Sequence, residues 1–108
     1  MSNYRSEELA EFAAMFKALS NPKRLAIFLR LASCCSGRLT CDITRAKGEC
    51  VGELGKDLGI APSTVSHHIK ELHRSGLLKM ERRGKQITCW IEPATVDRLR
   101  AFFVWPPS

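Results

Sequence analysis

The stretch from Val51 to Leu78 constrains the fold most, because it contains two short helical patterns separated by a tight turn. The first pattern, VGELGKDLG, predicts a helix over about residues 51–58, with Gly59 placed to end it in a left-handed conformation. In the second pattern, APSTVSHHIKELHRSG, Pro62 begins a helix and Gly76 closes it. Two short helices joined by such a turn are typical of a helix-turn-helix.

The residues after this unit change to a period of two. The sequence LLKMERRGKQITCWIEP predicts two strands, residues 77–81 and 86–91, joined by a turn through Arg83 and Gly84. The hairpin therefore has a basic tip. Its position directly after a helix-turn-helix is that expected of a wing, which contacts the DNA backbone or a minor groove.

Helical spacing also marks both ends of the chain. Apolar residues recur every three or four positions from Leu9 to Leu19, and Asn21 is placed to cap a second helix with Pro22 at its first position. A last helix is predicted at about residues 93–104. The length fits one domain over residues 1–108. We therefore expect a mainly helical α+β fold, a winged helix-turn-helix with four helices, a two-stranded wing and a C-terminal helix.

Basic charge is concentrated in the helix-turn-helix and the hairpin. Lys and Arg outnumber Asp and Glu by 17 to 11, which gives a net charge of +6. Residues 63–85 hold six Lys or Arg against two acidic residues. A protein with this charge is drawn to polyanions, and a helix-turn-helix makes double-stranded DNA the expected one.

The second helix of the unit has two different faces. Val65, Ile69 and Leu72 form an apolar stripe, whereas the other side is polar and cationic. Short polar groups near the start of such a helix reach base edges in the major groove, and longer cations anchor phosphates. The alternative is a solvated helix face beside a charged turn. The predicted DNA contacts are Ser63, Thr64, Ser66, His67, Lys70 and Arg74 on the helix and Arg82, Arg83 and Lys85 at the hairpin tip.

Four of the five cysteines lie in one polar, glycine-containing connection, predicted to be a loop at about residues 33–50. The N-terminal sequence lacks the features of a secretory signal and no apolar run could cross a bilayer, so we expect a cytoplasmic protein without a membrane partner. In the reducing cytosol, a cysteine cluster indicates metal binding or redox chemistry sooner than disulfides. The fifth, Cys89, alternates with Ile87 and Ile91 and is predicted to be a small core residue.

Three segments, ALSNPKRLAIFLRL, VGELGKDLGIAPSTVSHHIKELHRSGLL and ERRGKQITCWI, together resemble the ArsR family of winged-helix repressors over most of residues 9–103. The resemblance implies a homodimer held by its first and last helices and bound to a near-palindromic operator in double-stranded DNA. It also implies release of the operator when an inducer binds thiols or other ligands. A surplus of apolar residues agrees with a dimer. The predicted interface consists of Leu9, Phe12, Phe16, Leu99, Phe102 and Phe103.

In arsenic-sensing members that resemble this chain, a Cys-Val-x-x-Leu run on the third helix carries two or three thiols. The corresponding run here, CVGELG, keeps only Cys50 and has Gly52 and Gly55 where the others would fall. Arsenic(III) and antimony(III) are soft centres that three sulfurs satisfy well. Ligation would tighten the connection, shift the start of the third helix and spoil the fit of two recognition helices. The hypothesis is that such an inducer binds Cys34, Cys35, Cys41 and Cys50.

Other uses of the thiols stay open. The chain could be a repressor that responds to oxidant or persulfide, or an interaction domain with structural zinc, or the thiols could be inert. The histidines are not expected to bind metal, because His68 lies beside the apolar stripe and His67 suits a DNA contact. The last helix also lacks the His and acidic ligands of zinc-sensing members. An enzyme or an organic cofactor is not expected, since no nucleophile is paired with a positioned base and no glycine-rich phosphate loop is present.

Overall fold

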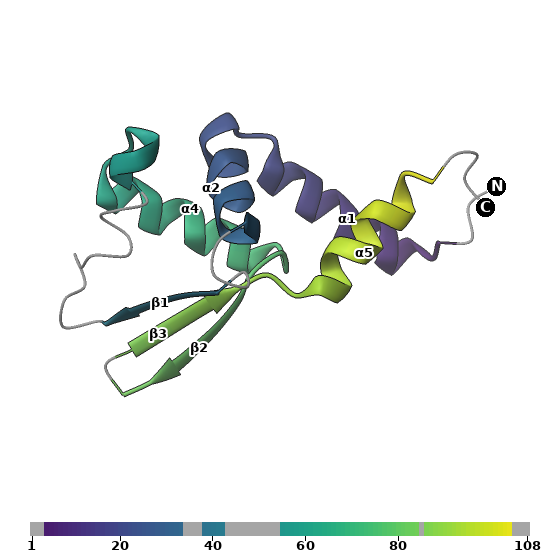
Figure 1. The fold of residues 1–108 in the computed structure, drawn as a ribbon. Helices are drawn as coiled ribbons and strands as arrows, with labels where there is room; N and C mark the ends of the chain where they lie inside the picture. Colours follow the sequence, from purple (N-terminus) through teal and green to yellow (C-terminus); the bar gives the residue numbers. More distant parts are fainter. Residues whose placement is uncertain (1–3, 34–37, 43–54, 85, 105–108) are drawn as a thin grey trace.

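The computed structural model describes residues 4–33, 38–42, 55–84 and 86–104 (Figure 1). Residues 55–58 form a short helical turn ahead of the second half of the chain. The other elements are α1 (Ser6–Leu19), α2 (Pro22–Ser33), β1 (Arg38–Asp42), α4 (Pro62–Arg74), β2 (Lys79–Arg83), β3 (Gln86–Trp90) and α5 (Pro93–Phe102).

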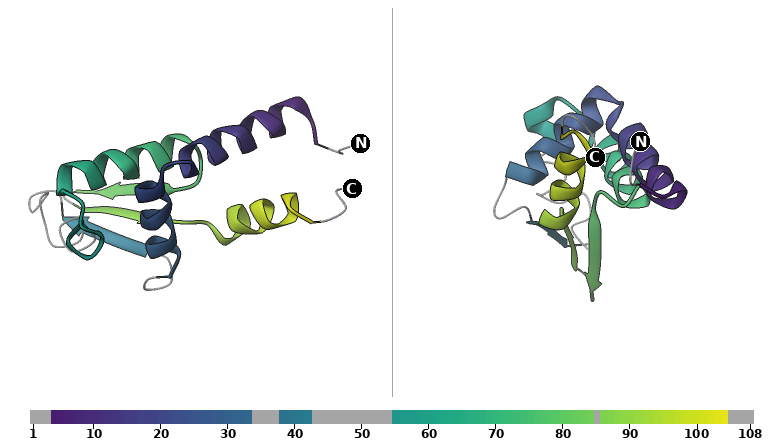
Figure 2. Two further views of the ribbon diagram at one scale, coloured as in Figure 1. Left: turned by 90° about the horizontal axis from the view of Figure 1, so that it is seen from above. Right: turned by 90° about the vertical axis from the view of Figure 1, so that its right-hand side faces the viewer.

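The helices and the sheet divide the molecule into two ends. In Figure 1, α1 and α5 lie together at one end, whereas the sheet lies at the other end beneath α2 and α4. Seen from above in Figure 2, α1 and α5 both extend beyond the sheet in the same direction. The predicted fold class, a mainly helical winged helix-turn-helix, is confirmed.

Within the described ranges, no helix combines the length and apolarity needed to cross a lipid bilayer.

The sheet has three antiparallel strands in the order β1-β3-β2. The predicted hairpin is present as β2 and β3, with Lys79 opposite Trp90 and Arg83 opposite Gln86. β1 lies inside the segment that was predicted to be a loop, so that prediction is wrong for residues 38–42. The five residues of β1, RLTCD, do alternate polar and apolar side chains, a signal that the sequence interpretation passed over. The strand pairs with the other edge of β3, a contact that is distant along the chain.

One hydrophobic core joins the helices to the sheet. α4 contributes Val65, Ile69 and Leu72, which confirms the predicted apolar stripe. Leu77 and Leu78, which lead from α4 into β2, are also buried. Burial on this scale is the main source of stability in a domain of this size. The core residues are Phe12, Met15, Ala18, Ile27, Leu31, Ile60, Val65, Ile69, Leu72, Leu77, Leu78, Cys89 and Ile91, so the prediction for Cys89 is confirmed.

Two local signals act as predicted. The side-chain oxygen of Asn21 accepts hydrogen bonds from the backbone N–H groups of Lys23 (2.9 Å) and Arg24 (3.1 Å), which caps α2. Gly59 has a φ of +68°, a left-handed conformation that most side chains disfavour, and the chain turns there before α4. The sequence therefore sets where α2 starts and where the turn of the helix-turn-helix falls.

Candidate nucleic-acid interface

The outward face of α4 carries the side chains predicted to contact DNA. The inward face is fixed in the core, with Val65 and Leu72 fully buried. The helix therefore cannot rotate about its axis without exposing apolar surface. Arg74, at its end, is ion-paired with Glu71 at 3.1 Å. On the outward face, Ser63, His67, Lys70 and Arg74 are exposed and Thr64 and Ser66 are half-buried.

The β2–β3 hairpin places further cations beyond α4. Arg82 is exposed, and its Nε donates a hydrogen bond to the backbone carbonyl oxygen of Gly84 at 3.4 Å, so its guanidinium lies beside the turn. Arg83 is the last residue of β2, and Lys85 lies outside the described residues. The predicted wing thus has at least one cation held at its tip.

The helical turn at residues 55–58 is held closely against the start of α4. The N–H of Ile60 donates to the carbonyl oxygen of Gly55 at 2.7 Å. A Cβ at Gly55 would lie 2.3 Å from the carbonyl oxygen of Ile60, which is closer than real Cβ atoms approach, so glycine is required here. Asp57 forms an ion pair with Arg30, which ties the turn to α2.

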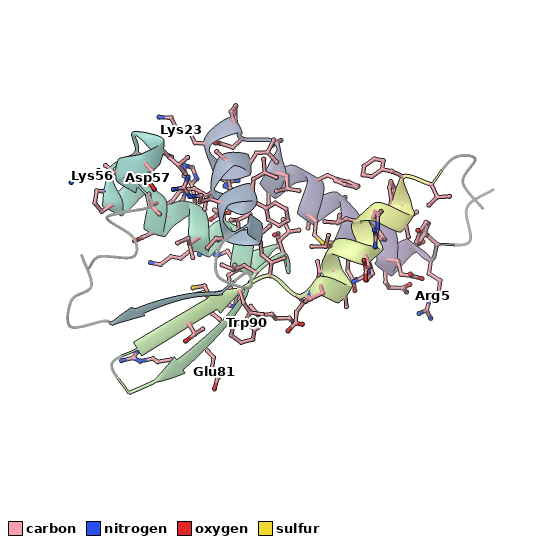
Figure 3. The ribbon with its side chains drawn as sticks, in the orientation of Figure 1. Arg5, Lys23, Lys56, Asp57, Glu81 and Trp90 are labelled. Carbon is pink, nitrogen blue, oxygen red and sulfur yellow. The ribbon has the colours of Figure 1, made fainter. Side chains whose placement is uncertain are left out.

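Sequence reasoning missed two exposed cations in this region. Lys23 lies in the first turn of α2, and Lys56 lies on the helical turn before α4 (Figure 3). Neither residue belongs to the predicted recognition helix or hairpin. Both lysines lie near the start of a predicted helix, Lys23 in NPKR and Lys56 in GKDLG. A cation at the start of a helix close to α4 is the signal that could have found them.

Arg24 connects three helices behind the outward face. Its Nε donates to Nδ1 of His68 on α4 at 3.3 Å, and its Nη1 donates to the carbonyl oxygen of Ala18 near the end of α1 at 3.2 Å. His68 is only 5% exposed, so it is a packed and hydrogen-bonded helix residue, in keeping with its place beside the apolar stripe. Burial lowers the pKa of His68 below its ordinary value of 6.5, and the positive charge of Arg24 lowers it further.

The described residues do not test the prediction that four cysteines bind an inducer. Cys34, Cys35 and Cys50 lie outside the described residues, as does Gly52. Cys41 belongs to β1, where its backbone pairs with Ile87 of β3. Among the residues that the structure describes, no three His, Cys, Asp or Glu side chains are grouped so that they could hold a metal ion. The proposed inducer site therefore stays a prediction.

The predicted interface residues divide into three classes of exposure. Phe103 is 69% exposed and Leu9 is 43% exposed, whereas Phe16, Leu99 and Phe102 are partly buried. Phe12 is 2% exposed and packs inside the protomer, with its ring centroid 4.7 Å from that of Phe102. Within one chain Phe12 therefore has almost no exposed area, and its assignment to an interface stays a prediction.

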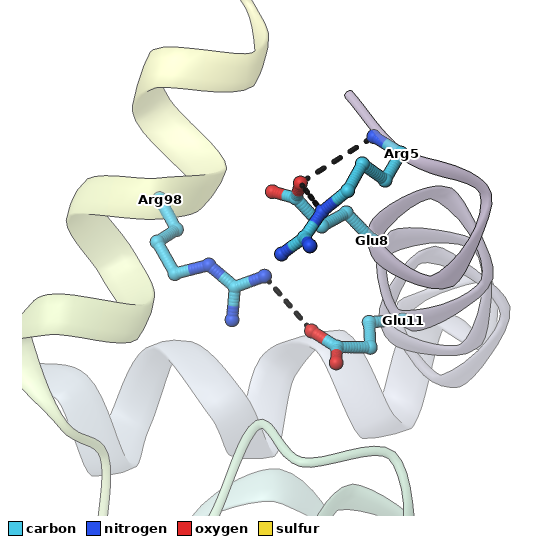
Figure 4. A network of polar contacts seen from close by, with 4 residues as sticks. All are labelled: Arg5, Glu8, Glu11 and Arg98. Atoms are coloured by element: carbon cyan, nitrogen blue, oxygen red, sulfur yellow. Dashed lines mark hydrogen bonds and ion pairs between the residues drawn. The ribbon is translucent and has the colours of Figure 1, made fainter. Parts of the chain in front are cut away.

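Polar contacts also join α1 to α5 (Figure 4). Arg98 donates to a carboxylate oxygen of Glu11 at 2.9 Å, and its guanidinium carbon lies 5.1 Å from the centre of the Phe12 ring. Near the start of α1, the N–H and Nε of Arg5 both lie 3.4 Å from one carboxylate oxygen of Glu8. The contacts of Arg98 orient α5 on α1 within one chain, whereas the Arg5–Glu8 contact stays at the start of α1.

The fold and this surface define a winged helix-turn-helix protein. A family model described as "Helix-turn-helix domain" matches residues 19–81, and the chain belongs to this family. It is 29% identical over 89 residues to the HTH-type transcriptional regulator YgaV of Escherichia coli strain K12, a match covering 82% of this chain and 78% of YgaV.

Three solved structures extend the comparison. An ArsR family transcriptional regulator, RHA00566, is 28% identical with a TM-score of 0.61, covering 85% of this chain and 87% of the other. The antimony-specific transcriptional repressor AntR is 28% identical with a TM-score of 0.61, covering 92% and 78%. The homodimeric winged helix-turn-helix DNA-binding domain Mb0332 of Mycobacterium bovis is 25% identical with a TM-score of 0.62, covering 94% and 82%. The chain is a transcriptional regulator of the helix-turn-helix type, and its structural neighbours include regulators of the ArsR family. These relatives regulate transcription and are not enzymes.

Proposed function

We propose that this protein is a transcriptional repressor that binds operator DNA as a homodimer in the cytoplasm. The observation that carries the proposal is the division of α4 into a buried apolar face and an exposed face of hydroxyl, imidazole and cationic groups. A helix fixed in this way presents its outward side chains at a constant angle to the major groove. The β2–β3 hairpin adds phosphate contacts on the same duplex.

The dimer brings two α4 helices to one operator. Its support is the exposed apolar surface of α1 and α5 together with the homodimeric relative Mb0332. In helix-turn-helix dimers, the two half-sites lie about one helical turn, roughly 34–36 Å, apart. The proposed operator is therefore a near-palindrome whose spacing matches the separation of the two α4 helices.

The proposed inducer is arsenic(III) or antimony(III), held by thiolates from Cys34, Cys35, Cys41 and Cys50. The proposal is supported by the preference of these soft centres for sulfur and by the likeness to the antimony-specific repressor AntR. In this proposal β1 couples the inducer site to the wing, because the strand that contains Cys41 pairs along its whole length with β3 of the wing. Ligation that displaces β1 would thus move the wing, as well as the helical turn before α4.

DNA binding is tested with the duplex that the wild-type protein enriches from a random-sequence pool. Lys70→Ala should weaken binding to all duplexes and reduce the salt slope by about 1, as expected for one lost phosphate contact. The matched control is Arg5→Ala, which removes one cation at the opposite end of the molecule (Figure 3) and should leave affinity and slope unchanged. Equal behaviour of the two variants would argue for an interaction domain that does not bind DNA through α4.

The inducer is tested by adding arsenite to the protein–DNA complex under reductant in a mobility-shift experiment. We expect release of the duplex, and loss of release when the four cysteines are changed to serine one at a time, although one of them can be spare. Cys89→Ser is the control, since Cys89 is buried in the core and should not take part. Release that requires an oxidant or persulfide and ignores arsenite would favour the sulfur-responsive repressor instead.

A further inference from the structure

The bond between Arg24 and His68 joins the part of the molecule that reads DNA to the part that dimerises. His68 is on α4, directly behind His67 on the outward face, with ring centroids 5.8 Å apart. Arg24 also binds the carbonyl oxygen of Ala18, in the last turn of α1. One guanidinium therefore spans from the helix that carries the DNA contacts to the helix on which the dimer is proposed to depend.

We propose that Arg24 and His68 are positioning residues for DNA recognition, which fix how α4 is set relative to α1 and hence to the second α4 of a dimer. This inference rests on the proposed DNA binding and names residues that do not touch DNA themselves. The planar guanidinium has donors in a fixed fork, so its two bonds define an angle between α4 and the end of α1. A lysine in its place keeps the charge but loses that fork.

The bond also requires a particular protonation state of His68. Because Nδ1 accepts the hydrogen bond from Arg24, it carries no proton, and His68 is neutral. Arg24 and Lys23 from α2 and His67 from α4 are the positive groups that act on it, and Glu71 is the opposing negative one. A proton on Nδ1 would break the bond and bring two positive charges together in a buried site.

The sign of the pH effect follows from this arrangement. Since burial and Arg24 lower the pKa of His68, the unfolded chain binds this proton more readily than the folded one below pH 6.5. The free energy of unfolding therefore decreases as the pH falls below that value, and sequence-specific DNA binding should weaken with it.

The first test compares two duplexes, the one enriched by the wild-type protein from a random pool and one of unselected sequence. Arg24→Lys should lower affinity for the enriched duplex by about tenfold and leave affinity for the unselected duplex nearly unchanged, because charge is kept while the buried acceptor loses its donor. The matched control is Arg5→Lys, the same exchange at an exposed arginine at the opposite end of the molecule, which should leave the ratio of the two affinities unaltered.

The second test uses His68→Asn, whose side-chain oxygen can take the place of Nδ1 and does not titrate. This variant should keep the affinity ratio of the wild type at neutral pH and lose the acid-dependent fall in specific binding. Because it retains the bond to Arg24, it also tests the inference if Arg24→Lys folds poorly, which thermal unfolding would reveal.

Two results would overturn the positioning role. In one, Arg24→Lys loses affinity equally for both duplexes with a smaller salt slope, which would make Arg24 a phosphate contact. In the other, the affinity ratio and its pH profile match the wild type in both variants. If the wild-type protein enriches no sequence from the pool, the proposed function is wrong, and the inference that rests on it is wrong too. This result does not depend on either variant, so it is distinguishable from failure of the positioning role alone.

Discussion

The end of the molecule around α4 and the end formed by α1 and α5 treat their apolar residues differently. On α4 itself, the large apolar side chains are covered within a single chain and the exposed face is polar, although Leu25 and Leu29 of the neighbouring α2 are exposed. At the other end an aromatic cluster also forms, but Leu9, Val96, Phe103 and Val104 remain exposed on its outside.

This contrast separates properties that depend on one chain from properties that depend on association of two chains. The end around α4, which carries the proposed DNA contacts, covers the apolar face of α4 within one protomer, so changes there should act on folding or on the proposed DNA contacts directly. The α1–α5 end has a preformed internal packing and an uncovered outer surface, so changes on that surface should act on association. Substitutions at the two ends of the molecule should therefore differ in what they change, folding at one end and association at the other.

The largest effect is expected from Leu72→Ala in α4. Leu72 is fully buried, and loss of such a side chain costs about 2–5 kcal/mol of the free energy of unfolding. Urea unfolding at a fixed protein concentration measures the change. The control is Leu29→Ala on α2, where the side chain is 58% exposed and the cost should be within about 0.5 kcal/mol. Similar costs at the two positions would mean that the α4 end is not the closed core described above.

A smaller loss is expected from Gly55→Ala, because the added methyl group would collide with the carbonyl oxygen of Ile60. We expect a cost of about 1–3 kcal/mol and weaker specific DNA binding, since relief of the contact must move the start of α4. Gly59→Ala provides the comparison: nothing lies near its Cβ, but its φ of +68° makes a cost of about 1 kcal/mol expected. A Gly55→Ala protein as stable as the wild type would show that the turn can relax.

The outer surface is tested by Phe103→Ser. We expect the dissociation constant of the dimer to rise by about tenfold or more, because an exposed aromatic of this size is a typical interface anchor. The helical content should stay unchanged, since Phe103 lies at the end of α5. Sedimentation measures the association and circular dichroism the folding. A dimer unaffected by this change would place the interface elsewhere and remove the division between the two ends.

The sequence predicted α4 and the turn before it well because their signals are local. The stripe of Val65, Ile69 and Leu72 and the left-handed Gly59 each depend on a few neighbouring residues, and the structure has both. The exposure of the outward face of α4 follows from the same periodicity. The predicted DNA contacts themselves remain predictions.

Features that depend on contacts between distant residues were not predicted from the sequence. β1 exists through its pairing with β3, almost fifty residues later, and the Arg24 to His68 bond joins residues 44 apart. Phe12 looked like surplus apolar surface, yet Tyr4 and Phe102 cover it from both ends of the chain. Periodicity shows that a face is apolar, but only the tertiary structure shows whether the same chain covers it.

The smallest expected effect belongs to the ion pair that joins α1 to α5. Arg98 and Glu11 have side chains 45% and 58% exposed, so solvent screens their attraction, and Arg98→Gln should cost about 0.2–1 kcal/mol. The contact of Arg98 with the Phe12 ring contributes further to the stability lost in this variant. At high salt, the contribution of the ion pair between Arg98 and Glu11 should weaken. A double-mutant cycle with Glu11→Gln isolates the pair. Because α5 is already held by aromatic packing, dimer affinity should change much less than in Phe103→Ser. A comparable loss of affinity would mean that orientation of α5, rather than its exposed apolar surface, governs association.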